Sequence, residues 1–115
     1  MEVTVLQIRL DGLRSAGEAD PLGRATIGYH KGMSEQQAWD AGRGVWKMNA
    51  DRVLEHDEAQ IIDPSGVVRA VARITGISKH GDRRAIEGLL LSGDDRVGRQ
   101  TSTPHPSRNP VHYIG

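Results

Sequence analysis

Two tryptophans, Trp39 and Trp46, lie seven positions apart in a chain of 115 residues that has no phenylalanine and only two tyrosines. Arg43 lies between the indoles and Lys47 follows the second one. Because an indole can stack on a nucleobase and a cation can pair with phosphate, this segment is a candidate ligand-binding site. Large aromatic side chains more often fill cores, so the competing interpretation is that both indoles anchor a helix onto a sheet.

Three further arginines, Arg69, Arg73 and Arg108, are candidate phosphate contacts in the second half of the chain. Residues 1–58 carry 7 Lys and Arg against 10 Asp and Glu, and residues 59–115 carry 8 against 5. The formal net charge is zero. An excess of three charges in one half is within ordinary surface variation, so charge alone indicates a polyanionic partner only weakly.

The residues that catalysis would require show no matching pattern. The chain has no cysteine, and its five histidines lack the spacing of a helical metal site, so we expect neither a metal nor a cofactor. No Gly-x-Ser-x-Gly elbow and no glycine-rich phosphate loop occurs. A metal-dependent nuclease or hydrolase that uses Asp63, Glu87 and Asp94 with Asp95 remains an alternative, although each carboxylate also has a local structural explanation.

No apolar run is long enough to span a bilayer, and the first residues lack the pattern of a signal peptide. We therefore expect a cytoplasmic protein with no membrane partner.

Alternating apolar residues and turn residues predict the elements that must position these side chains. Ser34 with Gln37 has the pattern of a capping box, and it predicts a short helix that ends at Gly42. Asn49 can cap a further helical turn over 50–54. Strands are predicted over 2–10, 24–30, 45–48, 59–63, 67–74, 83–91 and 111–114. The result is one domain over residues 1–115 of the α+β class, a small curved antiparallel β-barrel with one or two short helices.

Several spaced residues resemble a small uncharacterised bacterial domain with an aromatic-x-Ala-x-Arg-Gly-x-Trp segment. The resemblance covers about residues 35–114. Its residues are Trp39-x-Ala41-x-Arg43-Gly44-x-Trp46-Lys47-Met48, Val67-Val68-Arg69-x-Val71, Gly88, Val97-Gly98-Arg99 and Asn109-Pro110-Val111-x-Tyr113.

The Gly44-Val45-Trp46 segment, which follows a helix, is more distantly similar to YTH domains. YTH, EVE, ASCH and PUA domains share a small curved barrel, and many of them recognise RNA or modified bases. The resemblance implies a PUA-like barrel in which Trp46 corresponds to one wall of the cage around a methylated adenine. Counterparts of the other cage aromatics are not visible here, because only Trp39, Tyr29 and Tyr113 are available.

Three functions therefore remain open. The first is a non-enzymatic module for DNA or RNA that stacks a base, modified or not, on Trp46, with Arg43, Lys47 and Arg69 or Arg73 near phosphates. The second is a domain for a protein partner or for homodimerisation, in which both indoles belong to the core. The third is the nuclease or hydrolase.

Overall fold

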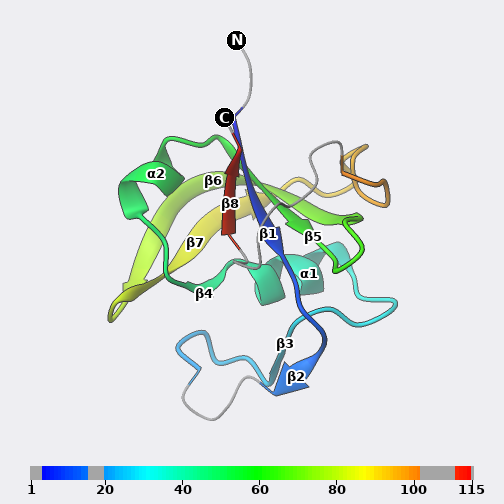
Figure 1. Ribbon diagram of the computed structural model, residues 1–115, viewed down its shortest axis with the longest axis horizontal. Coiled ribbons are helices and arrows are strands. Elements are labelled where there is room, and N and C mark those ends of the chain that lie inside the picture. Colours follow the sequence, from blue (N-terminus) through cyan, green and yellow to red (C-terminus); the bar gives the residue numbers. More distant parts are fainter. Residues whose placement is uncertain (1–3, 16–19, 102–110, 115) are drawn as a thin grey trace.

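The computed structural model describes residues 4–15, 20–101 and 111–114. They are built around one strongly curled sheet of six strands (Figure 1). The strand order across the sheet is β4-β7-β6-β5-β1-β8. The strands are β1 (Val5–Arg9), β4 (Gly44–Trp46), β5 (Glu58–Ile62), β6 (Val68–His80), β7 (Arg83–Leu90) and β8 (Val111–Ile114). The sheet is curled into half a barrel, with β4 and β8 as its end strands.

The predicted α+β class, with a strongly curved sheet and two short helices, is confirmed. The sheet is mixed, because β1 and β5 run parallel while the remaining neighbours are antiparallel. Parallel strands need a long crossover connection, and here the chain between β1 and β5 contains both helices. Apolar alternation reports which residues face the core but not the direction of the neighbouring strand, so the sequence did not predict this pair.

Both helices begin where the sequence predicted. Helix α1 (Glu35–Gly42) starts at a complete capping box: the Ser34 side chain accepts from the Gln37 amide at 3.1 Å, and the Gln37 side chain accepts from the Ser34 amide at 2.8 Å. Helix α2 (Ala50–Leu54) is capped by Asn49, whose side chain accepts from the Arg52 amide at 3.1 Å. No helix among the described residues is long and apolar enough to cross a bilayer.

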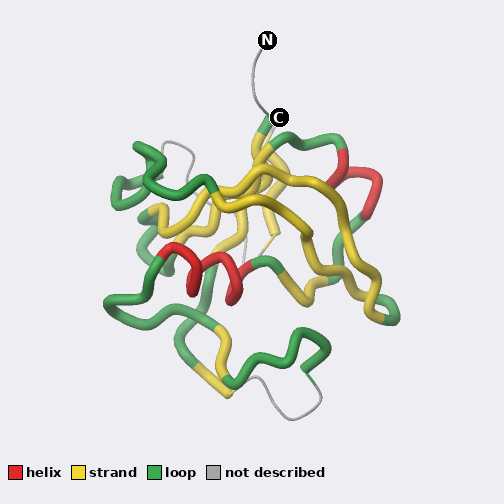
Figure 2. The backbone as a smooth tube through the Cα atoms, turned by 180° about the vertical axis from the view of Figure 1, so that it is seen from behind, coloured by secondary structure: helices red, strands yellow, loops and turns green. Residues whose placement is uncertain are grey.

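Strand β6 is longer than predicted, because a β-bulge between Ile74 and Gly76 lets it bend and continue to His80. Strand β7 pairs with it along this length, so the gap between the strands predicted over 67–74 and 83–91 is reduced to a tight turn at Gly81 and Asp82. The long bent hairpin curves over α1 (Figures 1 and 2).

The main core fills the space between α1 and the face of the sheet that α1 covers. Its buried side chains include Leu6, Ile8, Ala59, Ile61, Ala70, Ala72 and Ile86 from the sheet and Ala38, Trp39 and Ala41 from α1. A smaller cluster of Ile62, Val68 and Val71, covered by Leu91 and Val97, lies on the other face.

A two-stranded hairpin of β2 (Arg14–Ser15) and β3 (Thr26–Ile27) lies apart from the main sheet (Figure 1). The strand predicted over 24–30 is thus shorter than expected.

Candidate functional site

Trp39 belongs to the core, with 4% of its surface exposed. Its ring packs against Gly88 of β7, where an added Cβ would lie 3.0 Å from Cζ2 of the indole and 2.6 Å from the Arg73 carbonyl oxygen. The absence of a side chain at Gly88 therefore makes room for the indole. Trp39 has no open face for a ligand in this structure.

The glycines beside the tryptophans also allow close packing, of α1 on the sheet at Gly42 and of β4 on β7 at Gly44. A Cβ at Gly42 would meet the buried Ile61 side chain at 2.7 Å, and one at Gly44 would meet the Ala85 Cβ at 2.6 Å. The segment that the sequence analysis singled out is thus the junction between α1 and β4. Part of its pattern is explained by packing alone.

Trp46 is held differently, because it is half-buried and its indole N–H donates to the Gly42 carbonyl oxygen at 2.7 Å. This bond satisfies a carbonyl at the end of α1 and fixes the ring. Strand pairing places Trp46 opposite Arg84 of β7, and Arg84 opposite Lys79 of β6. Directly opposed residues of antiparallel strands share a face, so the three side chains form a row across three strands.

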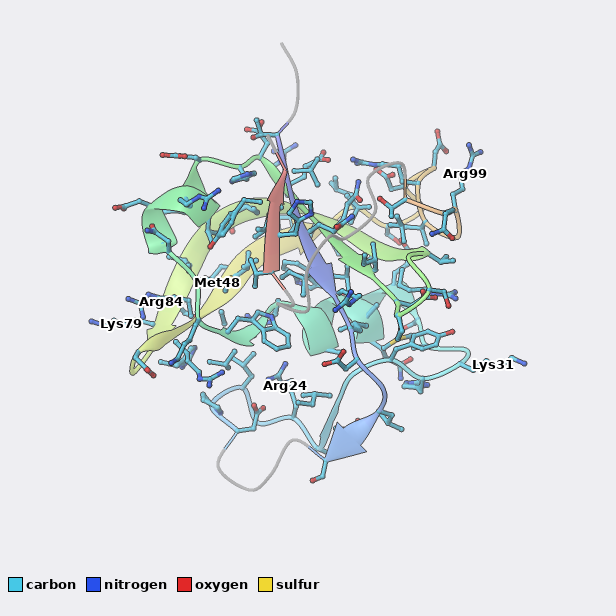
Figure 3. All side chains as sticks on the ribbon, viewed as in Figure 1. Arg24, Lys31, Met48, Lys79, Arg84 and Arg99 are labelled. Atoms are coloured by element: carbon cyan, nitrogen blue, oxygen red, sulfur yellow. The ribbon has the colours of Figure 1, made fainter. Side chains whose placement is uncertain are left out.

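This row lies at the tip of the β6–β7 hairpin, where Lys79 and Arg84 point outward together (Figure 3). The Arg84 guanidinium donates to the carbonyls of Gly81 and Arg83 within its own turn. Lys47, next to Trp46, is exposed. Within the described part of the chain, none of these three cations forms a salt bridge. Sequence reasoning missed Lys79 and Arg84, because strand register is what brings them to Trp46.

The other predicted site residues lie elsewhere. The Arg43 guanidinium donates to the Ile86 carbonyl oxygen at 3.1 Å, and its Nη1 lies 3.6 Å from Oε2 of Glu87. Arg43 therefore connects the end of α1 to β7. Arg73 is exposed on the opposite face of β6, where strand pairing sets it against Leu89. Arg108 lies outside the described residues.

Arg69 is engaged in a network with Asp63 and Tyr29. Its guanidinium donates to the Asp63 carboxylate at 2.8 and 2.9 Å and to the Tyr29 hydroxyl at 3.2 Å. Burial of Asp63 raises its pKa, but hydrogen bonds from the Val67 and Ser65 amides and from Arg69 outweigh burial and leave the pKa lowered. The Asp63 carboxylate therefore stabilises the turn before β6, and its oxygens already accept hydrogen bonds from Ser65, Val67 and Arg69.

Two of the remaining candidates for a nuclease centre, Asp94 and Glu87, are also paired with arginines, and Asp95 is exposed. Asp94 accepts from Arg96 at 2.8 Å, and Glu87 lies near Arg43. Among the described residues, no three His, Asp or Glu side chains are grouped so that they could hold a metal ion. The structure does not bring the acidic candidates together.

An arginine that sequence reasoning passed over, Arg24, ties the β2–β3 region to the end of α1. Its Nη1 donates to the carbonyls of Asp40, Ala41 and Gly44, while Nε and Nη2 bind the Asp20 carboxylate at 3.0 and 2.9 Å. Hydrogen bonding to Arg24 lowers the pKa of Asp20. A cation at the C-terminus of a helix is also favoured by the helix dipole. No local pattern around residue 24 predicts these contacts, which span up to 20 positions.

Comparison with protein-family models, curated proteins and solved structures gives no match for this chain.

Proposed function

We propose that the chain is a nucleic-acid-binding module that holds one base of a single strand against the exposed part of Trp46. The observation that carries the proposal is the row of Trp46, Arg84 and Lys79, and the exposed Lys47 follows Trp46 directly in the chain. An aromatic platform flanked by unpaired cations is a usual arrangement for binding single strands without strong sequence preference.

The fixed position of Trp46 supports this role. Its hydrogen bond to Gly42 and its packing against the core hold the ring before any ligand arrives, so stacking does not have to order it. Stacking contributes about 1–3 kcal/mol per base, and the cations must supply the remaining affinity.

The positions of the other aromatic side chains argue for a base stacked from one side. Trp39 packs on Gly88, Tyr29 lies under the Arg69 guanidinium, and Tyr113 lies between His56 and Arg52. None of them is available to complete a cage around a methyl group. Although Trp46 resembles the cage residue of YTH domains and the sheet is a curled half-barrel, we therefore propose a module that does not distinguish methylated from unmodified adenine.

The test is fluorescence anisotropy of a labelled single-stranded oligonucleotide titrated with wild type, Lys79→Gln, Arg84→Gln, Trp46→Leu and the control Arg73→Gln. Each lysine or arginine that neutralises a phosphate contributes about −0.7 to the slope of log K against log salt concentration. We expect a wild-type slope near −2, a slope shallower by about 0.7 in each of the first two variants, and no change in the control.

Trp46→Leu should weaken binding by about tenfold or more while its circular dichroism spectrum stays that of the wild type. Saturable quenching of tryptophan fluorescence should persist in Trp39→Phe, since only Trp46 would contact the base. A folded Trp46→Leu protein with unchanged affinity would rule the proposal out.

A second candidate function is homodimerisation or the binding of a protein partner, which the position of β8 at the end of the sheet favours. In the strand order of the described residues, β8 is the last strand after β1, and an end strand can pair with a strand of another chain. A mass of twice the monomer in light scattering, with no oligonucleotide binding, would favour this function over the first.

A further inference from the structure

Two adjoining hollows lie on the face of the sheet that α1 does not cover. They share a wall formed by Gln100 and Thr101. The first has a volume of about 140 Å³ and the second about 170 Å³. The first is also lined by Gln60, Val68, Arg96 and Arg99, and the second by Arg9, Ile62, Pro64, Ser65 and Gly66.

The charge of these hollows is one-sided, because among the described residues three arginines line them and no acidic residue does. Arg96 is committed to Asp94 and Glu58, with contacts of 2.8 Å to each. Arg9 and Arg99, in contrast, form no ion pair or side-chain hydrogen bond with any described residue. Arg9 is half-buried, and a guanidinium that has lost part of its hydration without gaining an acceptor is unfavourable.

The walls are fixed by the backbone before a ligand arrives. The Val68 amide donates to the Arg99 carbonyl at 2.9 Å, and the Thr101 amide donates to the Gly66 carbonyl at 2.8 Å. The Gln100 side chain donates to the Ser65 carbonyl at 2.9 Å. Residues 97–101 are therefore held against the turn that precedes β6, and the salt bridge of Arg96 to Glu58 anchors the start of this segment to β5.

From this geometry we infer that the two hollows form one binding site for a small phosphate monoester. Arginine is well suited to bind phosphate, because its planar fork of donors matches two phosphate oxygens. Arg9 and Arg99 would bind the phosphate, and the amides of Gln60 and Gln100 would accept or donate hydrogen bonds to the polar body of the ligand. Two small hollows suit a compact ligand better than they suit a polymer strand.

This site is independent of the proposed Trp46 site. Arg99 lies on the opposite side of the molecule from Lys79 and Arg84 (Figure 3). A loss of one activity therefore leaves the other measurable.

The test follows the amide resonances of Gly66 and Thr101 by NMR during titration with glycerol phosphate, inorganic phosphate or a single-stranded oligonucleotide. We expect saturable shifts with glycerol phosphate, and weaker binding of inorganic phosphate, which has no body to contact the glutamines. Arg9→Gln and Arg99→Gln should each weaken the binding of glycerol phosphate by about tenfold.

Two variants serve as matched controls in the same titration. Arg83→Gln removes an exposed arginine at the hairpin tip, and Lys79→Gln removes a cation of the other site; both should bind glycerol phosphate within about twofold of wild type. Arg99 is exposed, so Arg99→Gln keeps the test valid if Arg9→Gln fails to fold.

Three outcomes would overturn the inference. They are the absence of saturable shifts with glycerol phosphate, unchanged affinity in Arg99→Gln, and an oligonucleotide that shifts these amides at lower concentration than glycerol phosphate does.

Discussion

At the residue scale, Gly88 makes room for the ring of Trp39, and this sets how close α1 can lie to β7. Gly88→Ala should destabilise the fold by about 1–3 kcal/mol, because the new Cβ would meet a backbone carbonyl and a buried indole that cannot move aside freely. Urea unfolding measures the loss. Gly76→Ala is the matched control on the paired strand, since its Cβ would meet only the Glu87 Cβ at 3.9 Å. Equal stability of the two variants would contradict the packing role of Gly88.

The pairing of Asp94 with Arg96 makes part of the stability depend on pH. Hydrogen bonds from Arg96 lower the pKa of Asp94 from 3.8 to about 2. Because the folded pKa lies below the unfolded one, this stabilisation is complete above about pH 4 and is lost as the pH falls through 2.

Asp94→Asn should therefore lower the free energy of unfolding at pH 6 by on the order of 1–2 kcal/mol. The difference from wild type should shrink as the pH approaches 2. Chemical unfolding at a series of pH values measures it. Asp95→Asn, which removes an exposed neighbouring carboxylate, is the control and should leave the free energy of unfolding at pH 6 within about 0.5 kcal/mol of wild type. A constant difference between wild type and Asp94→Asn across this range would refute the assignment.

At the element scale, α1 has only eight residues, so its stability depends on its ends and on the sheet beneath it. Ser34→Ala removes the side chain that accepts from the Gln37 amide and should cost about 1 kcal/mol. Gln36→Ala, which loses only a bond to Asp40 on the helix surface, should cost about 0.3 kcal/mol. Thermal unfolding of both variants checks the order, and an equal loss would show that the cap contributes little.

Features that depend on neighbouring residues could be predicted from the sequence. The capping box of Ser34 and the Asn49 cap each arise from a few adjacent side chains and backbone groups. Contacts between distant positions could not be predicted, since spacing along the chain contains no information about them. The bonds of Arg24 to the end of α1 and the parallel pairing of β1 with β5 are of this kind.

The candidate site shows the same limit. The sequence identified Trp46 and Lys47 as unusual, but residue type alone could not separate the buried Trp39 from the half-buried Trp46. Lys79 and Arg84 are more than 30 positions from Trp46 in the sequence, and only the register of β4, β7 and β6 brings them to it. Burial and register are thus what the structure adds.

At the scale of the whole molecule, one main core joins both helices to the sheet, so we expect a single cooperative unfolding transition. In Trp46→Phe the remaining indole, Trp39, reports on the centre of that core. Its fluorescence and the far-UV circular dichroism signal should change at the same urea concentration. Two separate midpoints would contradict a single domain over residues 1–115.

The close contact between α1 and the sheet also has a consequence for ancestry. A binding surface can exchange lysine for arginine, or lose its tryptophan, when a descendant takes a new ligand. Gly42, Gly44 and Gly88 have no such freedom, because a side chain at Gly42 or Gly88 would push α1 off the strands and one at Gly44 would push β4 away from β7. Distant homologues of this chain should therefore be recognisable by glycine at these three positions long after their binding residues have diverged.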